Sequence, residues 1–132
     1  MSAIELSSLS ARQVRDGVAT GAFSARDVTD AAFARIEAID GDVHAFLELS
    51  RDLAYQAADR VDGMVAAGED LPPLAGVPVG IKDNMNLVGT HTTCASRMLE
   101  GHESVYDCTA VRRLLDAGAL PIGKCNMDEF AF

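Results

Sequence analysis

Apolar residues recur at helical spacing through the first half of the chain, and each stripe follows a helix-start signal. A capping-box spacing predicts a first helix that begins after Ser10 and stops near Gly21. Serine start signals predict a second helix over 24–40, which Asp40-Gly41-Asp42 ends, and a third helix over 50–68. The inner faces of the second and third helices are formed by residues three or four positions apart: Val28, Ala32, Ile36, Ile39, Leu53, Ala57, Val61 and Val65.

Apolar runs in the second half of the chain indicate strands. Residues 77–82 and 119–124 combine Val, Ile or Leu with Gly and Pro, and a helix that Asp107 caps lies between them. The order strand, helix, strand predicts a parallel pair in an α/β sheet. We therefore expect an α/β fold with an N-terminal helical segment over 1–70 and the first strands of the core over 71–132.

Two shorter patterns complete the expected fold. Alternating apolar residues over 43–49 predict a short, half-buried strand, and Asn126 is placed to cap a final helix that is interrupted at Phe132. Two central parallel strands leave backbone edges that need neighbours or a partner. The pattern therefore leads us to expect the front part of a longer protein.

Composition and charge exclude several classes of protein. Apolar residues make up 48% of the 132 residues, which excludes a disordered chain, and no run approaches the roughly 20 apolar residues of a membrane span. The N-terminus lacks the pattern of a signal peptide, and three widely spaced cysteines suit reduced thiols in a cytoplasm. The net charge of −9 disfavours direct nucleic-acid binding. It fits a halophilic source or an ordinary acidic protein equally well.

Lys82 is the candidate catalytic residue. It is one of two lysines in the chain, and it closes the apolar run 76–81, so we expect it to be buried or half-buried. Burial disfavours the charged form of a lysine, which would make Lys82 a candidate general base. The alternative is a lysine whose stem covers apolar surface while its ammonium stays in water.

Other possible sites are less well supported. Residues 118–125 nearly match a phosphate-binding loop, but the residues between the glycines are the predicted strand and Pro121 removes an amide donor. Four further residues could be grouped as metal ligands: His91, Cys94, His102 and Cys108. Their spacing matches no common zinc pattern, so scattered loop residues are the simpler interpretation. No serine lies in a Gly-x-Ser-x-Gly setting, so the chain offers a base without an evident nucleophile.

The stretch Gly76-Val-Pro-Val-Gly-Ile-Lys-Asp-Asn84 resembles the opening segment of the amidase signature family. The resemblance extends through 92–99 and 106–107 to 122–130, and the N-terminal helices also fit. The ending Asn126-Met-Asp-Glu-Phe130 is most similar to the branch of the family that serves tRNA-dependent amidotransferases. The resemblance thus covers essentially the whole chain.

This resemblance implies a mechanism. In the family, a Ser–cis-Ser–Lys triad hydrolyses amides inside a large α/β/α domain, and Lys82 matches the lysine. That lysine takes a proton from the nucleophilic serine through the cis-serine. Both serines lie downstream of the last matched segment, so the resemblance implies a truncated chain that is inactive alone.

The resemblance also implies partners. It predicts a glutaminase that passes ammonia to a B subunit, where ATP and Mg²⁺ are used to amidate mischarged Glu-tRNA(Gln) or Asp-tRNA(Asn), and a small C subunit that completes a cytoplasmic heterotrimer. No cofactor and no metal are expected in this chain, and no membrane. Two alternatives stay open: the start of a free-standing amidase that hydrolyses small amides, and a non-catalytic interaction module. A cooperative thermal transition of the 132-residue chain would favour the module.

Overall fold

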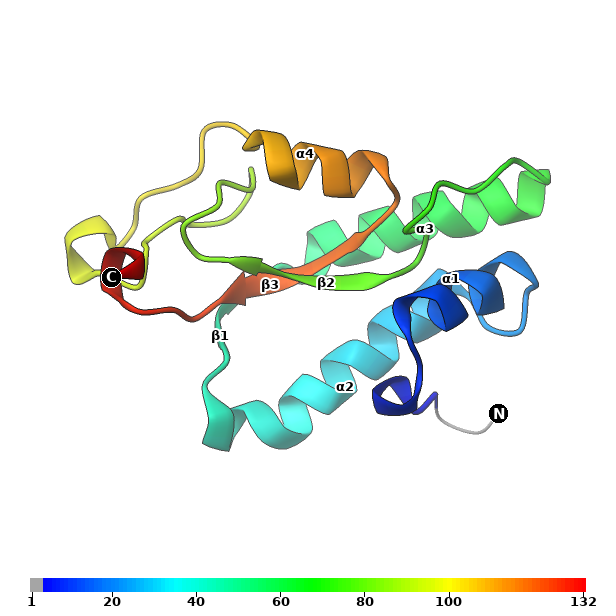
Figure 1. Cartoon of the computed structure of the whole chain (residues 1–132), viewed down its shortest axis with the longest axis horizontal. Helices are drawn as coiled ribbons and strands as arrows, with labels where there is room; N and C mark the ends of the chain where they lie inside the picture. The colour runs from blue at the N-terminus through cyan, green and yellow to red at the C-terminus, as the bar shows by residue number, and fades with distance from the viewer. Residues whose placement is uncertain (1–3) are drawn as a thin grey trace.

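The computed structural model describes residues 4–132, and over this range four α-helices surround a three-stranded sheet (Figure 1). The helices are α1 (Ala11–Ala19), α2 (Ala25–Val43), α3 (Arg51–Ala67) and α4 (Thr109–Asp116). The strands are β1 (Phe46–Leu49), β2 (Pro78–Lys82) and β3 (Leu120–Cys125). Short 3₁₀ turns lie at Leu6–Ser8, Arg97–Leu99 and Glu129–Ala131. The expected α/β class is confirmed.

The sheet has the order β1-β3-β2, with β3 in the centre. β2 and β3 are parallel and are joined through α4, which confirms the predicted strand–helix–strand unit. β1 adds to the other side of β3 in the antiparallel direction. Because β2 and β3 run in the same direction, their carboxyl ends, Lys82 and Cys125, meet at the same edge of the sheet.

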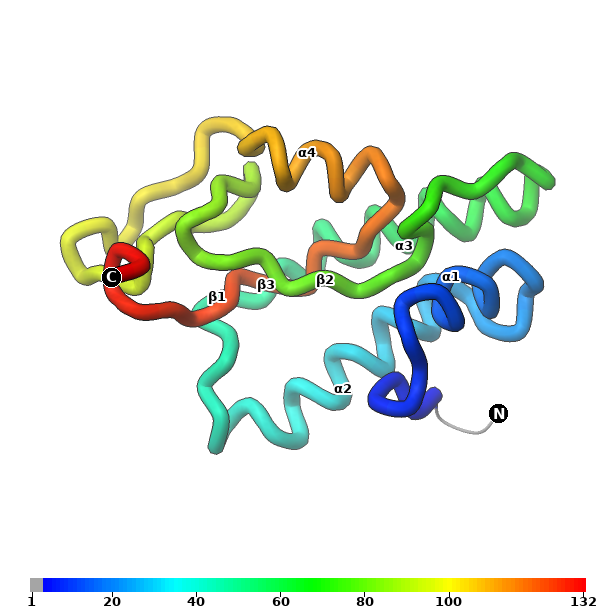
Figure 2. The backbone as a smooth tube through the Cα atoms, viewed as in Figure 1, coloured from blue at the N-terminus to red at the C-terminus, as the bar shows by residue number. Residues whose placement is uncertain are grey.

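Helices cover both faces of this sheet. In Figures 1 and 2, α4 lies on one side of β2 and β3, and α1 and α2 lie on the other, while α3 packs along β3. The main core joins apolar residues of α1, α2 and α3 to Val77, Leu120 and Ile122, and a smaller cluster joins Ile81 to Val111 of α4. None of the helices within residues 4–132 has the length and apolar character needed to cross a bilayer.

Two of the predicted helix starts are confirmed at atomic detail, whereas Ser50 precedes α3 without a side-chain cap. Ser10 forms a capping box with Gln13, and Ser24 forms one with Asp27. Hydrogen bonds from the Ser24 backbone amide and hydroxyl lower the pKa of Asp27. The start of α2 has a second cap from another helix, because the carboxylate of Asp62 accepts the amides of residues 25 and 26 at 2.7 and 3.1 Å.

The predicted strand over 43–49 is wrong in its first half. Asp40-Gly41-Asp42 does not end the helix, since α2 continues to Val43 and stops where His44 adopts a left-handed conformation with φ of 55°. The strand begins at Phe46, and an irregularity in its pairing with β3 between Phe46 and Glu48 interrupts simple alternation. Leu47, expected to face the core, is therefore exposed.

Two predicted caps also fail. Cys108, and not Asp107, is the N-cap of α4, because the Asp107 carboxylate accepts the amide of Val88 across the preceding loop. Asn126 caps no helix; its side-chain Nδ2 donates to the carbonyl oxygen of His44, and the last segment forms only a 3₁₀ turn. In both cases a contact distant in sequence takes the side chain that the local pattern assigned to a helix.

Candidate active site

Lys82 is the last residue of β2, and its side chain is exposed. The expectation that it is buried is therefore wrong in this structure. Register explains the difference: Lys82 lies opposite Cys125, whereas its buried neighbour Ile81 lies opposite Lys124. Successive residues of a strand point to opposite faces, so Ile81 and Lys82 cannot both face the α4 side. Within residues 4–132, the Lys82 ammonium makes no hydrogen bond or ion pair.

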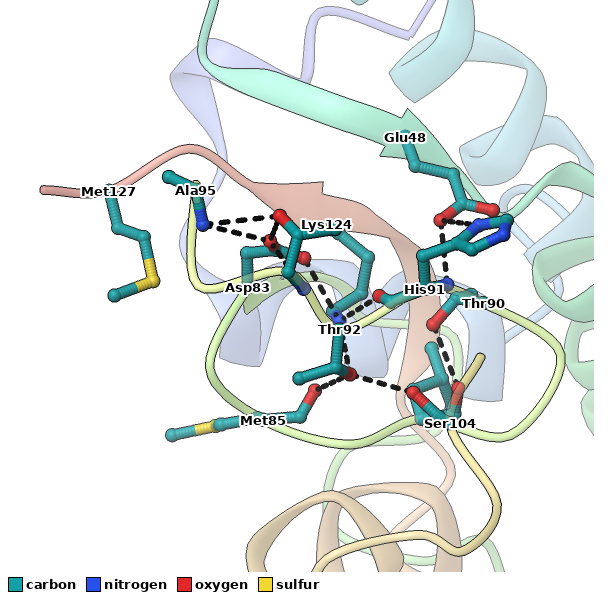
Figure 3. A network of polar contacts seen from close by, with 12 residues as sticks. Glu48, Asp83, Met85, Thr90, His91, Thr92, Ala95, Ser104, Lys124 and Met127 are labelled. Carbon is teal, nitrogen blue, oxygen red and sulfur yellow. Dashed lines mark hydrogen bonds and ion pairs between the residues drawn. The ribbon is translucent and has the colours of Figure 1, made fainter. Parts of the chain in front are cut away.

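The buried lysine is Lys124, near the end of β3, with none of its surface exposed. Its ammonium lies 3.1 Å from Asp83 Oδ1, donates to the carbonyl oxygen of His91 at 2.6 Å, and donates to Thr92 Oγ1 at 3.1 Å (Figure 3). An ammonium has three protons, and each has an acceptor here. Lys124 is thus a fully satisfied cation and a structural centre of the loop that follows β2.

Asp83 completes this network from the residue directly after Lys82. Its side chain is almost fully buried, and its second oxygen, Oδ2, accepts the amides of Thr93 and Ala95 and the Thr93 hydroxyl. Burial alone would raise the pKa of Asp83, but the hydrogen bonds from Thr93 and Ala95 and the contact with Lys124 outweigh it and lower the pKa. The buried pair is therefore an ionised carboxylate with an ammonium.

Backbone hydrogen bonds connect the loop after β2, residues 83–95, to the carboxyl ends of β2 and β3. The Asp83 amide donates to the carbonyl oxygen of Cys125 at 3.1 Å, and the Cys94 amide donates to the carbonyl oxygen of Asp83 at 3.3 Å. Cys94 and Ala95 both adopt left-handed conformations, with φ of 52° and 53°. Such conformations are disfavoured for residues other than glycine, so the surrounding hydrogen bonds fix the course of the loop.

The segment after β3 runs along this loop. The Phe130 amide donates to the carbonyl oxygen of Cys94 at 3.0 Å, and the Ser96 hydroxyl donates to Glu129 Oε1 at 2.6 Å. The matched sequence segments 76–84, 92–99 and 122–130, which are far apart in the chain, therefore converge at the carboxyl edge of the sheet. In α/β proteins this edge is the usual place for a binding or catalytic site.

The described part of the chain, residues 4–132, contains one lysine–hydroxyl–hydroxyl series of its own. Lys124 contacts Thr92, and Thr92 Oγ1 lies 2.6 Å from Ser104 Oγ. This series is not arranged as a nucleophilic centre, because Lys124 Nζ contacts the Asp83 carboxylate and donates to two further acceptors, so it is not directed at Ser104. Ser104 is also only 6% exposed, so a substrate could not reach it.

The four residues grouped as possible metal ligands do not come together. His91 Nδ1 lies 3.2 Å from Glu48 Oε2, and no group of three or more His, Cys, Asp or Glu within residues 4–132 is arranged to hold a metal.

The segment that nearly matched a phosphate-binding loop does not form such a loop. Its residues 120–125 are strand β3, and its lysine, Lys124, binds Asp83 in the interior. Burial, reinforced by the carboxylate of Asp40, raises the pKa of the Cys125 thiol, which argues against a reactive cysteine there.

Sequence reasoning missed the Lys124–Asp83 pair. The available signal was that Lys124, like Lys82, lies at the end of an apolar strand, and that an acidic residue directly follows Lys82. Local patterns alone could not decide which of the two lysines faces the interior.

Comparison with known proteins identifies a family whose sequence pattern this chain matches. The profile of the amidase family matches residues 27–132. The chain is 53% identical over 117 residues to the A subunit of glutamyl-tRNA(Gln) amidotransferase from Synechococcus sp., a match that covers 89% of this chain and 24% of that protein. The chain thus spans about a quarter of the length of the curated relatives that it matches.

Solved structures agree on the fold. The native peptide amidase from Stenotrophomonas maltophilia superposes with a TM-score of 0.88 at 31% identity, over 96% of this chain and 26% of that one. A second solved structure superposes with a TM-score of 0.89 at 38% identity. It belongs to a vestigial protein complex that reveals the evolutionary origins of an s-triazine catabolic enzyme. That match covers 92% of this chain and 27% of the other.

Proposed function

Because this chain belongs to the amidase family, we propose that it forms the lysine-bearing part of the ammonia-releasing subunit of a tRNA-dependent amidotransferase. The similarity to the A subunit of glutamyl-tRNA(Gln) amidotransferase over nearly the whole chain supports this choice among amidases. The single observation that carries it is the position of Lys82 at the carboxyl end of a parallel strand pair, where the matched motifs converge.

Lys82 acts as the general base in this proposal. Its neutral amine accepts a proton from a bridging serine hydroxyl, which in turn takes the proton of a nucleophilic serine. The serine oxygen then bonds to the carbonyl carbon of the glutamine side chain, and the carbon–nitrogen bond breaks with return of a proton to the departing ammonia. Water subsequently hydrolyses the acyl-enzyme to glutamate.

Exposure of Lys82 is compatible with this role only if further protein covers it. A lysine base must be neutral, and desolvation favours the neutral form. The described residues supply no hydroxyl in contact with the Lys82 ammonium, and both serines belong to later parts of the family pattern. We therefore propose that the 132-residue chain alone does not hydrolyse amides and that the lysine becomes active when further protein packs over the edge of the sheet.

The other components belong to partners in this proposal. Ammonia passes to a B subunit, which binds ATP, Mg²⁺ and the mischarged tRNA, and a C subunit joins them in a cytoplasmic complex. The net charge of −9 supports placing tRNA and ATP away from this chain, because a strongly acidic surface repels phosphate groups. No residue of this chain is proposed as a ligand of ATP or metal.

Substitution of Lys82 in the full-length protein, assembled with its partners, tests the proposal. Lys82→Met keeps the length of the side chain and removes the basic nitrogen, so we expect the rate of ammonia release from glutamine to fall at least about 100-fold. Arg112→Met removes an exposed cation from α4 and should leave the rate within about twofold. Near-wild-type glutaminase activity of Lys82→Met would overturn the assignment.

A free-standing amidase is the second candidate, and the similarity to peptide amidase favours it. The two candidates share the same lysine chemistry and differ in their dependence on partners. The full-length protein, purified without other subunits, should release ammonia from a peptide amide if it is a free-standing amidase. It should support tRNA amidation only with the B and C subunits if the first proposal is correct.

A further inference from the structure

We propose that the buried Lys124–Asp83 ion pair is a positioning device that holds Lys82 in register for proton transfer. The inference rests on the proposed function of Lys82. It assigns a role in the reaction to two residues that do not contact the reacting atoms themselves.

The residues on both sides of Lys82 are fixed to β3 at the position of the ion pair. Asp83 follows Lys82 directly, and its carboxylate contacts the Lys124 ammonium at 3.1 Å. Its backbone amide donates to the carbonyl oxygen of Cys125, the residue after Lys124. On the other side, Ile81 lies opposite Lys124 in the parallel ladder. The backbone at Lys82 therefore cannot slide or rotate relative to β3 unless a buried ion pair breaks.

The pair also shapes the loop that returns to the sheet beside Lys82. Lys124 binds the carbonyl oxygen of His91 and the Thr92 hydroxyl, while Asp83 binds the amides of Thr93 and Ala95. All the hydrogen-bonding capacity of the ammonium is thus used by this loop and by Asp83. The left-handed Ala95 is held by its hydrogen bond to the same carboxylate.

Stability alone does not explain why such a pair is buried here. Desolvation largely cancels the attraction within a buried ion pair, and apolar replacements of similar volume often leave a fold as stable as before. What this pair adds is a fixed geometry, because the ammonium contacts three acceptors and Asp83 Oδ2 accepts three donors, so neither group can move without breaking several of these contacts. Proton transfer requires a fixed geometry, because a displacement of the catalytic group by about 1 Å can reduce the rate by about 100-fold.

The test uses the full-length protein with its partners and compares kcat, KM and Tm. Lys124→Met alone leaves a buried carboxylate unpaired, so it should lower Tm strongly. The double variant Lys124→Met with Asp83→Asn removes both charges and should recover most of the Tm. If the pair positions Lys82, kcat of the double variant falls about 10- to 100-fold while KM for glutamine stays within about threefold.

Ser50→Ala is the matched control. Ser50 is a buried residue whose hydroxyl donates to the carbonyl oxygen of Pro121, on the same strand as Lys124 but away from its carboxyl end. Its loss should lower Tm without changing kcat. A double variant that recovers Tm and keeps wild-type kcat overturns the inference.

A second variant, Thr93→Val, tests the same inference if the double variant does not fold. The substitution keeps the shape of the side chain and removes the hydroxyl that donates to Asp83 and accepts the amide of Ala95, so kcat should fall together with a moderate loss of Tm. An unchanged kcat for this variant also overturns the inference. Lys82→Met separates the two proposals: if it retains activity the proposed function fails, and if it is inactive while the double variant is fully active only this inference fails.

Discussion

Lys124 lies directly opposite Ile81 on neighbouring parallel strands, one register step from Lys82 and on the other face of the sheet. The only two lysines of the chain therefore have opposite environments, one without exposed surface and one exposed. This separation assigns them different tasks. Lys124 is paired with Asp83 in the interior, and Lys82 is exposed at the carboxyl edge of the sheet.

Chemical modification should distinguish the two lysines in the 132-residue chain. Reductive methylation requires access to the amine, so Lys82 should react readily, whereas Lys124 reacts only when the loop over it opens. We expect at least about a tenfold difference in rate, measured by mass spectrometry of peptides after limited reaction. Equal rates at the two positions in the folded chain would contradict the burial of Lys124.

Local signals in the sequence were sufficient for the helices and for the parallel strand pair. The capping boxes at Ser10 and Ser24 and the left-handed Gly68 depend on residues within four positions of each other. A strand–helix–strand order allows few arrangements, so the pairing of β2 with β3 also followed from pattern. These elements are determined by short stretches of chain.

The arrangement around the candidate site depended on long-range pairing instead. Which of Lys82 and Lys124 is buried follows from the register of β2 on β3, and that register shifts between Val79 and Gly80. A shift of one residue changes the face on which every later side chain lies. Asp107 was misassigned for a similar reason, because its acceptor role toward Val88 appears only after the loop folds.

Glycine at position 123 should be required by the close approach of β1. A Cβ atom there would lie 2.5 Å from the carbonyl oxygen of Glu48, which is backbone and cannot move aside cheaply. Gly123→Ala should therefore lower the free energy of unfolding by about 1–3 kcal/mol, measured by urea denaturation. Gly63→Ala is the control: this helical position has open space, and the substitution should stabilise the chain by about 0.5–1 kcal/mol. Equal effects of the two substitutions would contradict the tight β1–β3 contact.

Asp62 should stabilise the chain through the start of α2. Its carboxylate accepts two backbone amides that no residue of α2 satisfies within the first turn. Asp62→Ala should lower the free energy of unfolding by about 1 kcal/mol. Asp59→Ala removes a carboxylate of the same helix that, among residues 4–132, pairs only with exposed Arg26, and should leave the urea midpoint almost unchanged. A larger loss for Asp59→Ala than for Asp62→Ala would show that surface ion pairing, and not capping, joins α2 to α3.

Stability should fall in acid because of the buried carboxylate. Hydrogen bonds and Lys124 hold the pKa of Asp83 below its ordinary value, so the folded state favours the ionised form. A group with a lowered pKa contributes its stability above the unfolded value, which is about 3.9 for aspartate, and loses it as the pH falls through the folded value. The free energy of unfolding should therefore decline below about pH 4 in urea titrations at several pH values.

The double variant Lys124→Met with Asp83→Asn gives this prediction its control. It has neither charge of the pair, so the part of the acid decline that comes from Asp83 should disappear. Asp27, whose pKa is also lowered by hydrogen bonds from Ser24, remains in the variant and should leave a shallower decline. If the variant and the parent chain lose stability with the same dependence on pH, then the Asp83 carboxylate does not stabilise the fold in its ionised form, and the network around Lys124 has to be reassigned.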